Sequence, residues 1–168
     1  MAGHDLITQL PPGYRFVPTD EELLKHYLAN KVHYQPFPAL LVEDIHAKEF
    51  YKKSPDTLVK NMCTEEEWYF FIHQDEYFRG DIVQIRIVGN EIGVWQCFGK
   101  EFPIYNAEGD LVGFKVNFKY YSKSAKKNKW TMEKYRLTSE CGTHEDEIEE
   151  WVLGRIIRGE KKNYTNFL

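Results

Sequence analysis

The sequence predicts an α+β domain, built as a strongly twisted antiparallel β-sheet flanked by a few helices. Three observations support this fold class. Aromatic residues make up 15% of the 168-residue chain, and aromatic side chains favour strands over helices. Several runs between residues 67 and 157 alternate apolar and polar residues, as half-buried strands do. One capped amphipathic helix is clear near the N-terminus, a second short helix is left open, and the length fits a single domain.

The first element is a helix that follows a stiff arm. Pro11 and Pro12 fix their own φ angles and keep the preceding residues extended. Thr19 can cap the helix, and Glu22 three residues later completes a capping box. The helix is expected to end at about Asn30. Apolar residues follow the cap at helical spacing: Leu23, Leu24, Tyr27 and Leu28.

The chain divides into one domain and two short tails. Residues 1–9 are expected to form a flexible N-terminal tail, residues 10–160 the domain, and residues 161–168 a basic C-terminal tail or the start of a linker. Within the domain, residues 31–39 contain two prolines and predict a loop. Residues 39–58 are ambiguous between strand and helix by pattern alone.

The strands follow in order along the rest of the domain. The clearest is Glu67–His73, EWYFFIH, because aromatic residues crowd it. The further strand candidates are residues 84–88, 93–101, 112–121, 130–137 and 149–157. Residues 106–110 contain Gly109 and predict a hairpin turn. The strongest alternation is in residues 112–121, which place Phe114, Val116, Phe118 and Tyr120 on one face and Lys115, Asn117 and Lys119 on the other.

The positive charge of the chain is concentrated in one stretch. The net charge is −4, which argues against a uniformly basic nucleic-acid binder. Residues 115–136 nevertheless hold eight Lys or Arg and one acid, Glu133, whereas residues 140–150 hold six acids and no Lys or Arg. This arrangement predicts one positively charged face with the acids elsewhere. Mobile lysines suit phosphates, although a lysine-rich loop is also often only solubilising.

The cysteines and the apolar runs exclude several classes of protein. Cys63, Cys97 and Cys141 are widely spaced and odd in number, without CxxC or Cys–His ligand spacing. Neither a disulfide framework nor a metal site is therefore predicted, and free thiols are typical of a reducing, intracellular compartment. The sequence has no hydrophobic signal core and no apolar run near the ~20 residues of a membrane span. We expect a soluble intracellular protein that does not bind membranes.

Nothing in the sequence predicts an enzyme. There is no phosphate-binding or dinucleotide-binding glycine pattern, no GxSxG and no HExxH. The six histidines are scattered and are interpreted as surface or structural residues. The neighbouring acids Asp75 and Glu76 are interpreted as a solvated turn rather than a catalytic pair. We accordingly expect no cofactor and no small-molecule substrate.

The N-terminal segment carries a family resemblance. The string LPPGYRFVPTDEEL, residues 10–23, resembles the opening motif of the NAC family of plant transcription factors, whose usual form is LPPGFRFHPTDEEL. The strings EWYFFIH, WTMEKYRL and EEWVLGRII resemble the family's EWYFFSPRD, WVMHEYRL and DWVLCRI, so the resemblance covers about residues 10–160. It implies a strongly curved antiparallel sheet flanked by helices. It also implies a nuclear transcription regulator that binds double-stranded DNA and dimerises with itself or another NAC-domain protein.

The resemblance implies a dimer contact in the N-terminal arm. In the NAC family an arginine and a glutamate of this segment pair across a two-fold axis, and the matching residues here are Arg15 and Glu22. A self-complementary patch suits such a symmetric contact, although Glu22 cannot serve both the capping box and this pair at full strength. An exposed ion pair contributes only ~0–1 kcal/mol, so apolar and proline contacts would hold most of the dimer. The implied interface residues are Leu10, Pro11, Pro12, Arg15 and Glu22.

The resemblance also implies a strand that reads DNA. The family's WKATGKD strand enters the major groove, which is wide enough for a β-ribbon, and the matching residues here read WQCFGKE from Trp95 to Glu101. Gln96 replaces a lysine and can read adenine with two hydrogen bonds. Phe98 replaces a threonine, and it could contact thymine methyl groups or belong to the core. The sequence leaves both roles of Phe98 open.

Two further segments depart from the family pattern. The arginine-rich SRPNR corresponds to DIVQIR, residues 81–86, and the phosphate-contacting loop GKAPKG corresponds to SKSAKKNK, residues 122–129. The implied DNA-binding residues are Arg86, Gln96, Lys100, Lys115, Lys119, Lys123, Lys126, Lys127 and Lys129. Because each lost phosphate contact weakens binding several-fold, we expect DNA binding weaker than, or different in preference from, that of typical members. The alternative is an interaction module that dimerises with other family members and modulates them with weak or no direct DNA binding.

Overall fold

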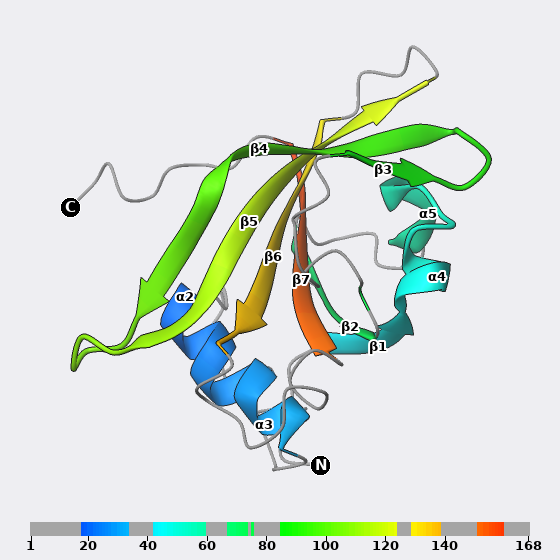
Figure 1. Ribbon diagram of the computed structural model, residues 1–168. Coiled ribbons are helices and arrows are strands. Elements are labelled where there is room, and N and C mark those ends of the chain that lie inside the picture. Colours follow the sequence, from blue (N-terminus) through cyan, green and yellow to red (C-terminus); the bar gives the residue numbers. More distant parts are fainter. Residues whose placement is uncertain are drawn as a thin grey trace, which may run out of the picture.

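The described part of the chain forms a strongly curled seven-stranded sheet with short helices packed on its faces (Figure 1). The computed structural model describes residues 18–33, 42–59, 67–73, 75, 85–123, 129–138 and 151–159. The strands are β1 (Val42–His46), β2 (Glu67–His73), β3 (Ile85–Val88), β4 (Gly93–Tyr105), β5 (Leu111–Ser122), β6 (Trp130–Leu137) and β7 (Trp151–Arg158). Their order across the sheet is β1-β2-β7-β6-β5-β4-β3. The predicted twisted α+β sheet is confirmed.

The sheet is antiparallel except at one edge, where β1 runs parallel to β2. A parallel neighbour needs a crossover connection of a dozen or more residues, and residues 47–66 supply it. This crossover begins with α4 (Ala47–Phe50) and α5 (Pro55–Leu58). The ambiguous stretch 39–58 thus contains both a strand and two short helices, and it makes the sheet mixed rather than wholly antiparallel.

The first helix is continuous from Asp20 to Val32. It consists of α2 (Asp20–Glu22), a π-helical turn η1 (Leu23–Leu28) and α3 (Ala29–Val32). The Thr19 hydroxyl accepts a hydrogen bond from the Glu22 backbone N–H at 3.1 Å, so the predicted cap is confirmed. The predicted apolar face is also confirmed, because all four of its side chains are buried: Leu23, Leu24, Tyr27 and Leu28. The arm that precedes this helix, residues 10–17, lies outside the described residues.

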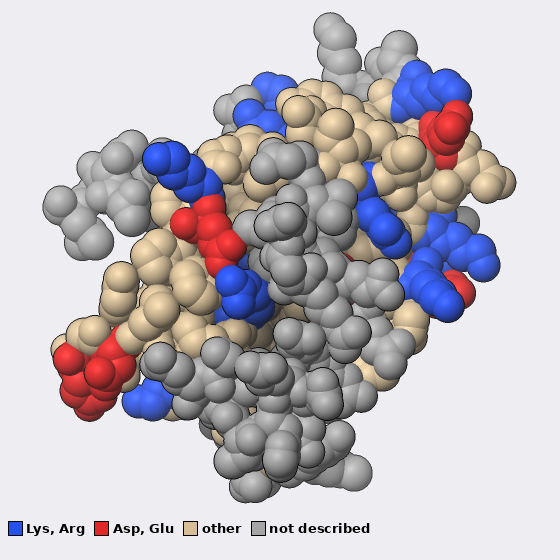
Figure 2. Space-filling view, in the orientation of Figure 1, with Lys and Arg blue, Asp and Glu red and all other residues tan. Residues whose placement is uncertain are grey.

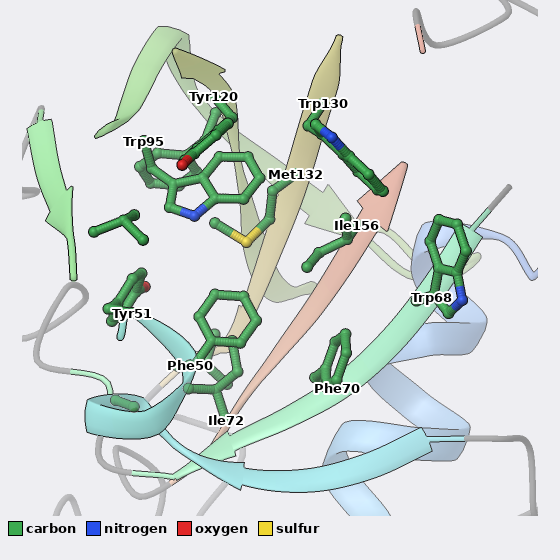
Figure 3. Packing of buried hydrophobic residues seen from close by; sticks show 14 of the residues in the cluster. Phe50, Tyr51, Trp68, Phe70, Ile72, Trp95, Tyr120, Trp130, Met132 and Ile156 are labelled. Atoms are coloured by element: carbon green, nitrogen blue, oxygen red, sulfur yellow. The ribbon is translucent and has the colours of Figure 1, made fainter. Parts of the chain in front are cut away.

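Both faces of the sheet carry a core. On one face, called the α4 face, side chains of β2 and β4–β7 pack against α4; Figure 3 shows Phe50, Phe70, Trp95, Trp130 and Met132 in this cluster. On the other face, called the α2 face, the first helix packs against a second cluster. Its sheet residues include Tyr69, Phe71, Ile104, Tyr135, Leu137 and Leu153. The first helix reaches only one end of the sheet (Figure 1), so none of the described helices covers the rest of the α2 face.

Charged groups tie the first helix to the sheet. The Asp20 carboxylate accepts a hydrogen bond from the Lys115 ammonium at 2.8 Å and lies 2.7 Å from the Tyr135 hydroxyl. The same hydroxyl is 2.6 Å from Glu133, a buried carboxylate that also faces Arg155 at 3.9 Å. Burial and these two carboxylates raise the pKa of Tyr135 well above its usual value. The helix start is therefore held by a buried polar network as well as by apolar packing.

Buried tyrosines on the α2 face predict a loss of stability at alkaline pH. Burial raises the pKa of Tyr27 to about 12 and also raises those of Tyr69 and Tyr135. The unfolded chain therefore releases these protons first, and the free energy of unfolding falls as the pH rises above ~10, by at most ~1.4 kcal/mol per pH unit for each tyrosine. Burial lowers the pKa of Lys134, so this group makes the free energy of unfolding rise with pH. That rise ends near pH ~10.4, the usual pKa of lysine. Urea denaturation between pH 8 and pH 11.5 should show the fall, and a flat profile above pH 10.5 would contradict it.

Candidate nucleic-acid interface

Strand β4 places its predicted DNA-reading residues on the open part of the α2 face. Trp95 is fully buried on the α4 face, and side chains alternate along a strand, so Gln96 and Phe98 point the other way. In the strand register, Gln96 lies opposite Ile85 of β3 and Lys119 of β5. Directly paired residues share a face. Ile85, Gln96 and Lys119 therefore form one row across three strands.

Neighbouring rows extend this surface with apolar side chains. Ile87 and Tyr121 both pair with Val94, one row from Gln96. The exposed fractions are 52% for Ile85, 54% for Ile87, 40% for Phe98 and 52% for Tyr121. The Lys119 ammonium lies 4.9 Å from the centroid of the Phe98 ring. We call this surface the β3–β5 patch, defined as Ile85, Ile87, Gln96, Phe98, Lys119 and Tyr121.

The exposure of Phe98 decides the choice that the sequence left open. A core phenylalanine is almost fully buried, as Phe118 is on the opposite face of β5. Phe98 instead lies on the α2 face beyond the reach of the first helix, with the Lys119 ammonium 4.9 Å from the centroid of its ring. Phe98 is therefore a surface residue that is free to contact a ligand.

The structure corrects the prediction for Lys115. Its side chain is only 13% exposed and forms ion pairs with Asp20 at 2.8 Å and Glu133 at 3.5 Å. Burial alone would lower the pKa of Lys115, but the hydrogen bond and charge of Asp20 and Glu133 outweigh it and raise that pKa. Lys115 and Lys119 share a strand face as predicted, yet Lys115 lies under the first helix. It holds the helix to the sheet and is not offered to a phosphate.

Arg86 does not join the β3–β5 patch. It pairs with Trp95 in the strand register and therefore lies on the α4 face, opposite to Gln96. Its guanidinium is 4.7 Å from the centroid of the Tyr51 ring, a distance at which a cation–π contact is favourable. Arg86, which the family resemblance implies to bind DNA, thus lies on the opposite face of the sheet from Gln96.

The remaining described lysines are exposed around the patch. Lys100 lies in a β-bulge of β4 next to Gly99, whose φ of +76° favours glycine. Lys123 lies 3.9 Å from Glu91, and both side chains are about three-quarters exposed, so this pair is weak. Lys129 is exposed beside β6. The predicted residues Lys126 and Lys127, and the arm residues Leu10, Pro11, Pro12 and Arg15, lie outside the described residues; Glu22 is described and exposed.

Figure 2 bears on the prediction of a single positive face. In that view the described Lys and Arg side chains lie in separate groups, with Asp and Glu among them. Part of the reason is that three cations of the basic stretch are paired with carboxylates: Lys115 with Asp20, Lys134 with Asp75, and Arg136 with Glu101. The exposed positive charge of this stretch is therefore smaller than its composition indicates.

Asp75 was expected in a solvated turn, and that expectation is wrong. Asp75 is 2% exposed, and its carboxylate accepts hydrogen bonds from the Lys134 ammonium at 2.6 Å and the Tyr51 hydroxyl at 2.8 Å. Lys134 is fully buried between Met132 and Arg136 on the α4 face of β6. The signal that could have found this pair is the lysine itself, because a lysine at a core-facing position of a strand requires a buried anion.

Within the ranges that the structure describes, no group of three or more His, Cys, Asp or Glu side chains could hold a metal ion. No helix of those ranges is long and apolar enough to cross a membrane. Cys97 is a free, half-buried thiol whose pKa burial raises, so it packs as a small apolar side chain.

Comparisons with known proteins place the domain. The family model described as "No apical meristem (NAM) protein" matches residues 11–137. NAC domain-containing protein 101 of Arabidopsis thaliana is 36% identical over 171 residues, 95% of this chain and 47% of that protein. NAC domain-containing protein 72 is 37% identical over 89% of this chain and 50% of that protein, and transcription factor JUNGBRUNNEN 1 is 36% identical over 88% and 54%, both from the same plant.

These similarities and the curled sheet define an α+β domain of a class found in plant proteins. The chain belongs to the NAC (No apical meristem) family. It spans about half the length of the curated relatives it matches.

Proposed function

We propose that this domain binds double-stranded DNA with sequence preference, as part of a plant transcription regulator that acts in the nucleus. The observation that carries the proposal is the exposed α2 face of β4, where Gln96 lies beside Lys119 and Lys100 follows four residues further along the strand. A two-stranded ribbon fits the major groove, and the helix that covers the other end of this face stops short of it. Gln96 would read a base edge there.

Lysines around this strand would position the domain on the phosphates. The proposed set excludes Lys115, because Asp20 and Glu133 occupy its ammonium. It also excludes Arg86, because the guanidinium stacks on Tyr51 on the opposite face. The lysines that remain are Lys100, Lys119, Lys123, Lys126, Lys127 and Lys129. If all six contact phosphates, the logarithm of the binding constant would fall with that of salt at a slope of about −5 per protomer.

The N-terminal arm would supply the second half of the recognition unit. By the family resemblance, Arg15 of one protomer would pair with Glu22 of its partner, and Leu10, Pro11 and Pro12 would pack beside this pair. Glu22 is exposed on the first turn of the helix, which suits a contact with a partner. A dimer would bring two copies of β4 to successive half-sites on one face of the duplex. The partner could be a second copy or another NAC-domain protein.

Selection from a random duplex pool, followed by a salt titration, tests the proposal. We expect enrichment of a paired half-site and a steep fall of affinity with salt. Lys119→Ala should weaken binding several-fold and make the salt slope shallower by about one. Lys53→Ala is the matched control, because Lys53 is exposed after α4, which packs on the opposite face of the sheet from Lys119. No measurable binding to any duplex at 50 mM salt would overturn the proposal.

A second candidate function is favoured because two of the cations that the family resemblance implies for DNA binding are engaged within the domain. Lys115 and Arg86 are engaged within the domain, and the β3–β5 patch is mostly apolar. A domain of this kind could pair with other NAC-domain proteins through its arm and modulate them with little DNA contact of its own. A mass increase on mixing with a NAC-domain partner, combined with no duplex binding at low salt, would favour this candidate.

A further inference from the structure

The β3–β5 patch is unusual for a surface that is proposed to approach a polyanion. Four of its six side chains are apolar or aromatic, and each is between 40% and 54% exposed: Ile85, Ile87, Phe98 and Tyr121. Single exposed apolar residues need no explanation, but a contiguous group marks a contact surface. The first helix covers the α2 face at the other end of the sheet and does not bury the β3–β5 patch.

The polar members of the patch lie at its centre. Gln96 has Ile85 on one side and Lys119 on the other, one strand spacing away in each direction. Phe98 is two residues further along the same face of β4, with the Lys119 ammonium 4.9 Å from its ring. The carboxylate that follows in the next row, Glu133, is 2% exposed and points into the buried network. The patch thus offers an amide and a cation among apolar groups, which is complementary to an anion that also carries apolar groups.

We propose that this patch reads A·T base pairs through the thymine methyl group. The inference rests on the proposed duplex binding and names the base pair that the same site prefers. In the major groove, an A·T pair presents the N7 acceptor and N6 donor of adenine and the C5 methyl of thymine, whereas a G·C pair has no methyl. Gln96 would make two hydrogen bonds to adenine. Phe98 and Ile85 would pack on thymine methyls, with Lys119 toward the neighbouring phosphate.

The strand geometry sets the spacing of the bases that are read. Gln96 and Phe98 are two residues apart on one face, which corresponds to about 6.8 Å along a strand. Base pairs in duplex DNA are spaced by roughly 3.4 Å. For a strand that follows the groove, the adenine read by Gln96 and the thymine read by Phe98 would lie two base pairs apart. Ile85, across one strand spacing of about 4.8 Å, would contact a methyl nearer to that adenine.

Replacing thymine by deoxyuridine removes only the methyl group and tests the proposal directly. Each thymine of the selected duplex would be replaced in turn, and affinity measured at fixed salt. Burying one such group is worth ~0.8 kcal/mol, or about fourfold in affinity. We expect a loss of that size at the thymine two base pairs from the adenine. Phe98→Thr should bring the thymine-to-uracil ratio at that position close to one.

Two controls keep the result interpretable. Tyr105→Thr removes an aromatic side chain that is 55% exposed at the far end of β4, and its thymine-to-uracil ratio should match that of the unmodified protein. Both substitutions are on the surface and should leave the midpoint of urea denaturation nearly unchanged. Circular dichroism and urea denaturation would check this.

The outcomes separate this inference from the proposed function. A protein that binds its duplex equally well with thymine or uracil at every position retains the function and loses the inference. A ratio that Phe98→Thr leaves unchanged also overturns the inference, because the methyl would then be read elsewhere. Preference for single strands over the duplex would show that the aromatic residues stack on bases and would overturn it as well. Absence of any duplex binding removes the proposed function itself.

Discussion

Replacing Asp75 with alanine is expected to destabilise the protein by about 3–5 kcal/mol, since it removes the carboxylate that balances a buried ammonium. The Lys134 ammonium is fully buried and 2.6 Å from the Asp75 carboxylate. It also lies 4.6 Å from the centroid of the Tyr51 ring and 5.1 Å from that of Phe118. Neither ring can replace a carboxylate. Urea denaturation at pH 7, followed by tryptophan fluorescence, would measure the loss.

A second ion pair of the same length provides the control. Lys31 and Asp44 are also 2.6 Å apart, but the Asp44 side chain is 52% exposed. The Lys31 side chain is 20% exposed, and its ammonium also lies over the rings of Phe71 and Trp151. Asp44→Ala should therefore change the free energy of unfolding by less than about 1 kcal/mol. Equal losses for the two variants would show that burial is not what makes the Asp75 contact important.

Trp95→Ala is expected to cost about 3–5 kcal/mol, the usual range for a large aromatic side chain removed from a core. Trp95 is fully buried, and its ring centroid is 5.1 Å from that of Tyr120. Figure 3 shows it pointing from β4 into the cluster on the α4 face. Because Gln96 and Phe98 alternate with Trp95 on the same strand, we also expect the variant to bind duplex DNA more weakly under conditions where it remains folded.

Phe98→Ala separates the effect on stability from the effect on DNA binding. Phe98 is on the opposite face of β4 and 40% exposed, so its removal should leave stability nearly unchanged and act on binding alone. The free energy of unfolding and the affinity for the selected duplex would be measured for both variants. A stable Trp95→Ala protein with full affinity would show that the buried ring does not position the strand.

The local sequence pattern predicted some elements well, because neighbouring side chains alone determine their structure. The run Glu67–His73 is a strand with the predicted bounds, since aromatic and β-branched residues on both faces fit only a strand buried on both sides. The Thr19 cap was readable for the same reason. The elements of the stretch 39–58 could not be predicted from the local pattern, because each of the three is five residues or shorter. Periodicity needs a longer window to separate strand from helix.

The candidate interface depended on facts that a local pattern does not hold. Alternation placed Lys115 and Lys119 on one strand face, and the structure agrees, but only Lys115 meets Asp20 of the distant first helix. Alternation places Arg86 and Ile85 on opposite faces of their strand. The strand register decides which of the two lies on the same face as Gln96. A shift of one residue exchanges the faces. Tertiary contact and register, rather than propensity, therefore decided which predicted residues meet.

The position of β7 in the sheet has a consequence for how the chain folds. This strand, residues 151–158, lies between β2 and β6, and its pairing joins Glu67 to Ile157. By contrast, β4 and β5 are joined by a short turn in which Gly109 donates to Asn106. Loop closure over long separations is slow, so the β4–β5 hairpin would form early and the two halves of the sheet would join last. A nascent chain would thus hold β1 and β2 apart from the rest until β7 had been synthesised.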